Sequence, residues 1–197
     1  MRRILFRWVS GLIGILAVLA GPLAAAAPLS LAQDHASAIG LSTRVFQESD
    51  GRLTLSEAMA AYQAGRFSPG TNPVLSFGIG TRPVWIRFAV TNPMPSPLPR
   101  RLSIETAWLD HIEVYFRHRG ETVATYRAGD TQAFAQRPVA SRYFVFDHAF
   151  GAGVSEVFIR VETPDPMVVP ITLLSPESLR QRQTQQALSY GIVYGFL

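Results

Sequence analysis

The chain has 197 residues and contains neither cysteine nor lysine, so all 18 of its cationic residues are arginines. The missing cysteines exclude disulfides, thiolate metal sites and cysteine nucleophiles. Arg2, Arg3 and Arg7 precede a leader-like segment, which leaves 15 of the 18 arginines against 14 acids in the rest of the chain. This near balance argues against a nucleic-acid partner, despite the formal net charge of +4.

Met1–Ala32 has the pattern of an export signal, with a basic start, the apolar run Leu12–Leu19 and an alanine-rich end. Cleavage fits after Ala26 or after Ala32. The alternative is an uncleaved anchor helix, but Gly21 and Pro22 interrupt the run before the roughly 20 residues that a membrane span needs. A cleaved signal predicts an inner-membrane protein of a Gram-negative bacterium whose following domain, residues 33–176, lies in the periplasm.

In the first part of that domain, the sequence predicts a disordered start over residues 33–41, a short strand at Thr43–Gln47 and one helix. Thr54 and Glu57 have the spacing of a capping box, and Gly65 lies where a glycine commonly ends a helix. The expected apolar stripe of this helix, at spacings of three and four, consists of Leu55, Ala58, Met59 and Tyr62.

Val84–Pro93 gives the clearest strand signal, because apolar residues alternate strictly with Trp85, Arg87, Ala89 and Thr91. Further strands are expected at intervals of about ten residues, separated by turns such as Arg119-Gly120. This spacing predicts an all-β fold, an antiparallel, jelly-roll-like β-sandwich over residues 42–176. The other expected strands are 102–106, 111–117, 122–127, 141–147, 156–162 and 168–174. The expected core consists of Ile86, Phe88, Ile104, Ile112, Val114, Phe146, Ile159 and Val161.

Residues 177–197 predict a helix that leaves the domain. Ser175 is a typical N-cap, and Pro176 suits the first helical position. The helix begins polar and becomes apolar from Ala187 to Leu197. This change predicts a juxtamembrane helix followed by the truncated start of a first transmembrane helix.

No catalytic constellation is recognisable in the sequence. The four histidines, His35, His111, His118 and His148, form no metal-binding motif, and no serine lies in a nucleophile elbow. His111 and Glu113 share a strand face, but such a pair is more often solvated than bound to metal. We therefore expect neither an enzyme nor a cofactor.

A binding role has more support. Trp85 and Arg87 project from one face of their strand, while the other face supplies the core. An indole stacks on a sugar ring, and a guanidinium binds carboxylates with two parallel hydrogen bonds. Tyr115 and Arg142 would complete this surface if their strands are neighbours. The alternative is structural, with Trp85 packed beneath the helix at 53–62 and Arg87 paired with an acid.

Several short motifs occur in order along residues 42–176. They are Trp85-Ile-Arg87-Phe88, Asn92-Pro93, Leu109-Asp110-His-Ile112-Glu-Val114-Tyr115, Gly129-Asp130, Arg137-Pro138, Arg142-Tyr-Phe144-Val-Phe146 and Pro170-Ile-Thr-Leu173. This series resembles the type 2 extracellular sensor domain of the bacterial 7TMR-DISM receptors, which are seven-transmembrane receptors with diverse intracellular signalling modules. The resemblance implies a jelly roll similar to carbohydrate-binding modules, a seven-helix membrane unit and a cytoplasmic diguanylate cyclase or histidine kinase.

The sequence thus predicts a periplasmic domain that senses a carbohydrate or a small carboxylate-bearing ligand. A bound ligand would shift the C-terminal helix between two arrangements. Two alternatives stay open. One is a sandwich that docks a protein partner or a second copy of itself, and the other is a secreted carbohydrate-binding module.

Overall fold

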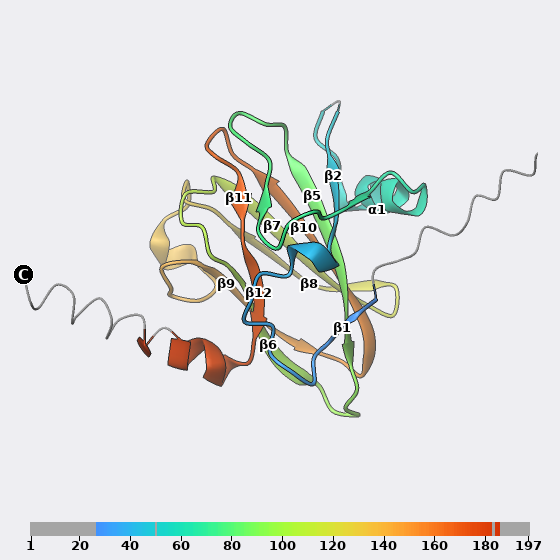
Figure 1. The fold of residues 1–197 in the computed structure, drawn as a ribbon, viewed down its shortest axis with the longest axis vertical. Coiled ribbons are helices and arrows are strands. Elements are labelled where there is room, and N and C mark those ends of the chain that lie inside the picture. The colour runs from blue at the N-terminus through green and yellow to red at the C-terminus, as the bar shows by residue number, and fades with distance from the viewer. Residues whose placement is uncertain (1–26, 50, 183, 186–197) are drawn as a thin grey trace, which may run out of the picture.

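A computed structural model describes residues 27–49, 51–182 and 184–185 (Figure 1). Most of the predicted export signal, residues 1–26, and the predicted apolar stretch from Ala187 therefore lie outside the described residues.

The largest sheet is organised around the predicted strand at Val84, which is β5 (Val84–Asn92). β10 (Gly153–Glu162) pairs with one edge of β5 along its whole length. The other edge pairs with β2 (Arg44–Gln47) and, further along, in parallel with β1 (Leu29–Ser30). The full order is β3-β2-β5-β10-β7-β8, with β3 at Ser68–Pro69, β7 at His111–His118 and β8 at Glu121–Ala128.

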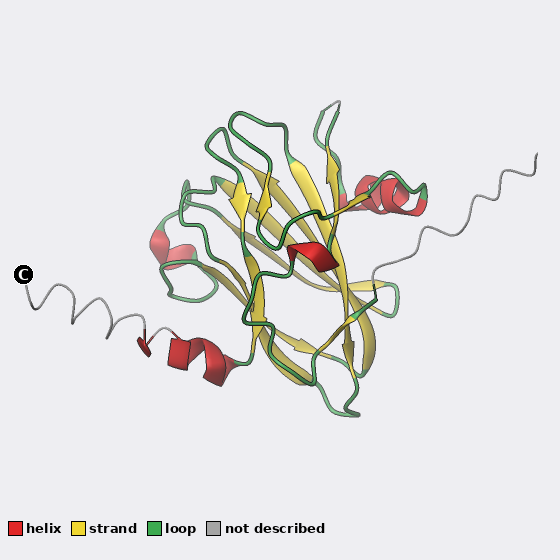
Figure 2. Ribbon diagram, in the orientation of Figure 1, coloured by secondary structure: helices red, strands yellow, loops and turns green. Residues whose placement is uncertain are grey.

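Opposite this sheet lies a smaller one in the order β12-β6-β9, and a strand pair, β11-β4, extends the fold at one end (Figure 2). Their bounds are β4 Leu75–Ser76, β6 Leu98–Ile104, β9 Phe144–Phe150, β11 Val168–Val169 and β12 Ile171–Leu174. The prediction of a single strand over 168–174 is therefore wrong, because two strands, β11 and β12, occupy this range. Pro170 divides it, because proline has no N–H for a ladder, and its carbonyl instead accepts the Glu105 N–H at 3.0 Å.

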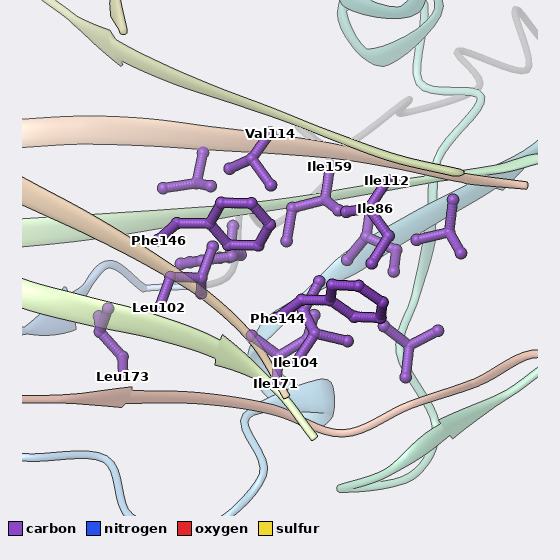
Figure 3. Packing of buried hydrophobic residues seen from close by; sticks show 14 of the residues in the cluster. Ile86, Leu102, Ile104, Ile112, Val114, Phe144, Phe146, Ile159, Ile171 and Leu173 are labelled. Carbon is purple, nitrogen blue, oxygen red and sulfur yellow. The ribbon is translucent and has the colours of Figure 1, made fainter. Parts of the chain in front are cut away.

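The main hydrophobic core fills the space between the large sheet and the small one (Figure 3). Ile86, Ile112 and Ile159 project into it from the large sheet, and Ile104 and Phe146 from the small one. All eight residues of the predicted core are buried here. The all-β antiparallel sandwich expected from the alternation is thus confirmed.

The helix α1 (Leu55–Gln63) covers the outer face of the large sheet. The predicted capping box is present, since Thr54 Oγ1 accepts the Glu57 N–H and Glu57 Oε2 accepts the Thr54 N–H at 2.8 Å. Gly65 follows the helix with a φ of +72°, a conformation that glycine adopts without strain. Ala58 and Ala61 of α1 pack on Trp85 and Phe158, which explains why β5 is buried on both faces. The two 3₁₀ turns are η1 (Gly40–Ser42) and η2 (Phe134–Gln136).

Residues 33–41 follow a defined path, in contrast to the disordered start expected from their polar composition. His35 and Leu173 exchange two backbone hydrogen bonds, at 2.8 and 3.1 Å. The Ile39 N–H donates to the Ile171 carbonyl at 2.9 Å, and the Ile39 side chain is buried. Pairing with β12 therefore orders a segment that lacks a strand pattern of its own.

Residues 176–182 are helical, and this helix lies on the side of the sandwich away from α1 (Figure 1). Ser175 is its N-cap as predicted, since Ser175 Oγ accepts the Ser178 N–H at 3.1 Å. Within the described residues, no helix combines the length and hydropathy needed to cross a bilayer.

Candidate functional site

Trp85 is fully buried beneath α1, so it offers no face to a ligand. Its Nε1–H donates to Glu48 Oε1 at 2.8 Å, and its ring stacks on Tyr115 with 5.9 Å between the centroids. The expected stacking platform is therefore wrong. The second face of β5 is buried because α1 packs over it.

Arg87 is also mostly buried, at 7% exposure. Its Nη2 contacts Glu156 Oε1 at 2.6 Å, and its guanidinium lies 4.4 Å from the centre of the Tyr62 ring. The other Glu156 oxygen accepts from Arg117 at 3.1 Å. These contacts match the structural alternative for Arg87, an arginine paired with an acid under a covering helix.

Tyr115 lies in the large sheet, whereas Arg142 lies in no strand. Tyr115 is half-buried on β7, and its hydroxyl donates to Glu113 Oε2 at 3.0 Å. Arg142 is exposed in the segment before β9, where its guanidinium lies 5.5 Å from the Tyr143 ring centre. The structure thus brings Trp85 and Tyr115 together but leaves Arg142 apart, because β9 pairs with β6 and not with the large sheet.

A row of charged side chains crosses the outer face of the large sheet beside Trp85. The pairing places Arg160 of β10 next to Trp85, then Glu113 of β7, then Arg127 of β8. Residues opposite one another on neighbouring strands have their side chains on the same face. The sheet register therefore assembles this row from residues far apart in the sequence.

Arg160 forms the buried end of the row. Its Nε and Nη2 donate to the two oxygens of Glu48 at 2.8 and 3.0 Å, and its Nη1 contacts Glu162 at 2.7 Å. Burial alone would raise the pKa of Glu48, but hydrogen bonds from Arg160 and Trp85 prevail and hold it below the ordinary value. Both groups are therefore charged at neutral pH.

Glu113 is the middle residue of the row and lies between two exposed arginines. Arg52, from the loop before α1, contacts Glu113 Oε1 at 2.5 Å, and Arg127 contacts the same oxygen at 3.4 Å. The two arginine side chains are 61% and 71% exposed, whereas the Glu113 side chain is only 10% exposed. Burial and the Glu113 carboxylate raise the pKa of the Tyr115 phenol, which keeps it a hydrogen-bond donor.

Two adjoining hollows open over this row, and we call them together the arginine cleft. Their volumes are about 380 and 630 Å³, and Arg52, Arg160 and Glu162 line both. Four arginines and three glutamates line the cleft. The full lining is Glu48, Ser49, Gly51, Arg52, Arg82, Pro83, His111, Ile112, Glu113, Arg127, Ala128, Gln132, Arg160 and Glu162.

Part of this site could be recognised from the sequence pattern. Glu113, Arg160 and Glu162 lie within alternating strand patterns, but on sequence grounds only His111 and Glu113 form a recognisable pair, of a kind that could bind a metal. Across the described ranges, no group of three or more histidine or acidic side chains is placed to hold a metal ion. Glu48 and Arg52 lie outside regular elements, so no periodic pattern marks them.

Comparison with known proteins bears on the whole sandwich. A family model described as 7TMR-DISM extracellular 2 matches residues 40–175, a range that includes every residue of the arginine cleft. The chain belongs to the 7TMR-DISM extracellular 2 family. The resemblance noted in the sequence is thereby confirmed. No curated protein matches the chain significantly.

Membership of the 7TMR-DISM extracellular 2 family makes this sandwich a periplasmic sensory domain of a membrane receptor. The family is one of sensors and not of catalysts. A sensory domain needs a site that a ligand reaches from solvent. The arginine cleft has that access, whereas the surface expected around Trp85 does not.

Proposed function

We propose that this domain senses a small carboxylate-bearing ligand that binds in the arginine cleft. The signal then passes to a cytoplasmic output of the diguanylate cyclase or histidine kinase type, as the family resemblance implies. The ligand would be held by salt bridges from exposed guanidinium groups, which recognise carboxylates with two parallel hydrogen bonds.

The observation that carries the proposal is a surplus of cationic donors at the cleft. Arg82 is exposed at its rim, and its side chain has no acidic partner within the described part of the chain. Arg52 and Arg127 share one carboxylate oxygen of Glu113, so most of their N–H groups face solvent. These donors favour a ligand that brings a negative charge of its own.

A carbohydrate has less support at this site. Sugar rings present apolar C–H faces that stack on aromatic side chains, and tryptophan and tyrosine are the usual platforms. No phenylalanine, tyrosine or tryptophan lines the arginine cleft among the described residues. The lining is dominated by charges, which suit a carboxylate better than a neutral sugar.

Thermal unfolding of the full chain with a panel of small carboxylates tests the proposal. The panel contains mono- and dicarboxylates, with neutral monosaccharides alongside. A ligand that binds only the folded state, at free concentration c, raises the free energy of unfolding by RT ln(1 + c/Kd), so the Tm rises with the logarithm of the ligand concentration once this exceeds the Kd. We expect at least one carboxylate to raise the Tm, and Arg82→Gln and Arg127→Gln each to remove most of that rise.

Arg119→Gln is the matched control, because Arg119 is exposed in the turn between β7 and β8 and does not line the cleft. It should leave the ligand-induced rise unchanged. A rise in Tm with monosaccharides alone would show that the domain binds a carbohydrate and not a carboxylate. A carboxylate effect that Arg119→Gln removes as fully as Arg82→Gln would show non-specific charge binding and overturn the assignment of the site.

A further inference from the structure

The N-terminal segment connects the two main sheets. β1 pairs in parallel with β5 of the large sheet, and the next N–H, of Leu31, donates to the Thr91 carbonyl at 2.9 Å. Four residues later, His35 pairs with Leu173 of β12 in the small sheet. We call residues 29–36 the strap, because they cross from one sheet to the other within a few residues.

The strap also holds the start of the C-terminal helix. Asp34 Oδ1 accepts the Ser175 N–H at 2.6 Å, and Oδ2 accepts the Ser175 hydroxyl at 3.1 Å as well as the Ser178 hydroxyl. Arg100 of β6 lies on the other side of the same carboxylate, with its Nε 3.8 Å from Oδ1. One side chain of the strap thus accepts three hydrogen bonds at the N-terminus of this helix.

A second contact fixes the helix one turn further on. Arg182 Nη1 donates to the Ala36 carbonyl at 3.1 Å and contacts Glu105 Oε1 at 2.9 Å. Between these two polar contacts, Leu179 is buried against Leu174 and Val145 of the small sheet. The helix is therefore held on the sandwich by the apolar contact of Leu179, by Asp34 and by Arg182. The strap supplies the Asp34 contact and, through the Ala36 carbonyl, one of the two partners of Arg182.

We propose that the strap is the link through which the large sheet controls the position of the helix at 176–182, with the Asp34 carboxylate as its latch. The helix follows β12 covalently, so the small sheet needs no further connection to it. The large sheet, which carries the arginine cleft, reaches the helix through the strap. A displacement of β5 along its edge would pull on residues 29–31 and loosen the three hydrogen bonds at Asp34.

This inference extends the proposed function but does not depend on which ligand binds. Asp34 is partly exposed, and burial works against its ionisation, but hydrogen bonds from Ser178 and Ser175 lower its pKa below the ordinary value. Asp34 is therefore ionised at neutral pH and can accept all three hydrogen bonds without a ligand. The latch opens only if a force on the strap outweighs these contacts.

Limited trypsin digestion of the full chain tests the latch, because trypsin cuts after arginine and lysine and the chain has no lysine. The measured quantity is the rate of cleavage at the Arg180–Gln181 bond, followed by mass spectrometry. Asp34→Ala removes the latch. Asp147→Ala is the matched control, because Asp147 also pairs with an arginine of β6, Arg101 at 2.6 Å, but does not touch the helix.

We expect Asp34→Ala to speed cleavage at Arg180 about tenfold, since charge-assisted hydrogen bonds are lost and cleavage follows the population of the open form. Arg182→Gln should speed it as well, and Asp147→Ala should not. Cleavage after Arg119, in the β7–β8 turn, should keep its wild-type rate in all three variants.

Equal rates at Arg180 in Asp34→Ala and wild type would overturn the proposal. So would an equal acceleration in Asp147→Ala, or an acceleration at Arg119 as large as the one at Arg180, which would indicate general unfolding. The carboxylate-induced rise in Tm separates this inference from the proposed function. The Asp34→Ala variant should still show this rise in Tm. If the wild type shows no rise, the proposed ligand site is refuted, but the inference about Asp34 and the helix still stands.

Discussion

Glu48 and Arg160 form an ion pair with two hydrogen bonds, and their side chains are only 3% and 2% exposed at the floor of the arginine cleft. The pair joins the end of β2 to β10 directly beneath the arginine cleft. Glu48 also accepts hydrogen bonds from the Trp85 indole and the Leu53 backbone. Every oxygen of the carboxylate is therefore occupied, which is the condition under which a buried charge is tolerated.

Glu48→Ala should lower the free energy of unfolding by about 3–5 kcal/mol, because it leaves the Arg160 charge buried without its main partner. Urea denaturation followed by circular dichroism measures the change. Asp147→Ala breaks an exposed pair with Arg101 and should cost less than about 1 kcal/mol. Similar losses in the two variants would mean that the buried pair contributes no more than a surface pair.

Phe88→Ala should cost about 3–5 kcal/mol, because Phe88 is 1% exposed in the core between the sheets and its removal leaves a cavity. Phe134→Ala removes the same side chain from a site that is 57% exposed, so it should have little effect. Equal midpoints for the two variants in urea would contradict the packing of β5.

Glu113→Gln should tighten carboxylate binding. Glu113 occupies Arg52 and Arg127 in the structure, and a ligand carboxylate has to compete with it for the same donors. The amide keeps the shape of the side chain and removes the competing charge, so the Kd measured by calorimetry should fall. A weaker Kd in this variant would show that Glu113 positions the arginines and does not compete.

Stability should fall between about pH 6.5 and pH 4 because of His148. Its ring stacks on Phe116 at 4.2 Å between centroids. Burial, and then the neighbouring His118, lower the pKa of His148 from 6.5 to about 4. In this window the unfolded chain binds a proton that the folded chain does not, so the free energy of unfolding decreases as the pH falls.

The variant His148→Phe keeps an aromatic ring on Phe116 and removes the titrating group. Between pH 6.5 and pH 5 its free energy of unfolding should therefore change less than that of the wild type, as measured by urea titration at each pH. His111→Gln, at an exposed position outside this contact, should keep the wild-type slope. An unchanged slope in His148→Phe would assign the pH dependence to other groups.

Cleavage of the export signal is expected after Ala26 and not after Ala32. Leu29 and Ser30 form β1, and the Leu31 side chain is fully buried in the main core. A cut after Ala32 would remove all three residues from the fold. Sequencing of the exported protein from its N-terminus should begin at Ala27, and a start at Gln33 would show that the sandwich forms without β1.

The sequence predicted features that depend on local pattern. The alternation in Val84–Val90 identified β5, and the spacing of Thr54 and Glu57 identified the start of α1, because both are decided within a few residues. The position of Trp85 was not predictable in this way. Its exposure depends on whether α1 covers the second face of β5, and both a solvent face and a covered face are compatible with the same alternation.

The candidate site was predicted only in part, for a related reason. Glu113 and Arg127 meet because β7 and β8 pair in one particular register, and Arg52 reaches them from a loop. The order of residues 33–41 was not predictable because their partners lie in β12, and no pattern within the segment indicates that pairing. In each case the missing information was a contact between distant parts of the chain.

The strap also constrains the order in which the domain folds. Asp34 and Ser175 are 141 positions apart, so the first residues to reach the periplasm cannot take their final place until almost the whole domain has emerged. Closing so long a loop is slow compared with forming a hairpin such as β7–β8. We therefore expect the sheets to assemble first, and the helix toward the membrane to be seated in the last step of folding.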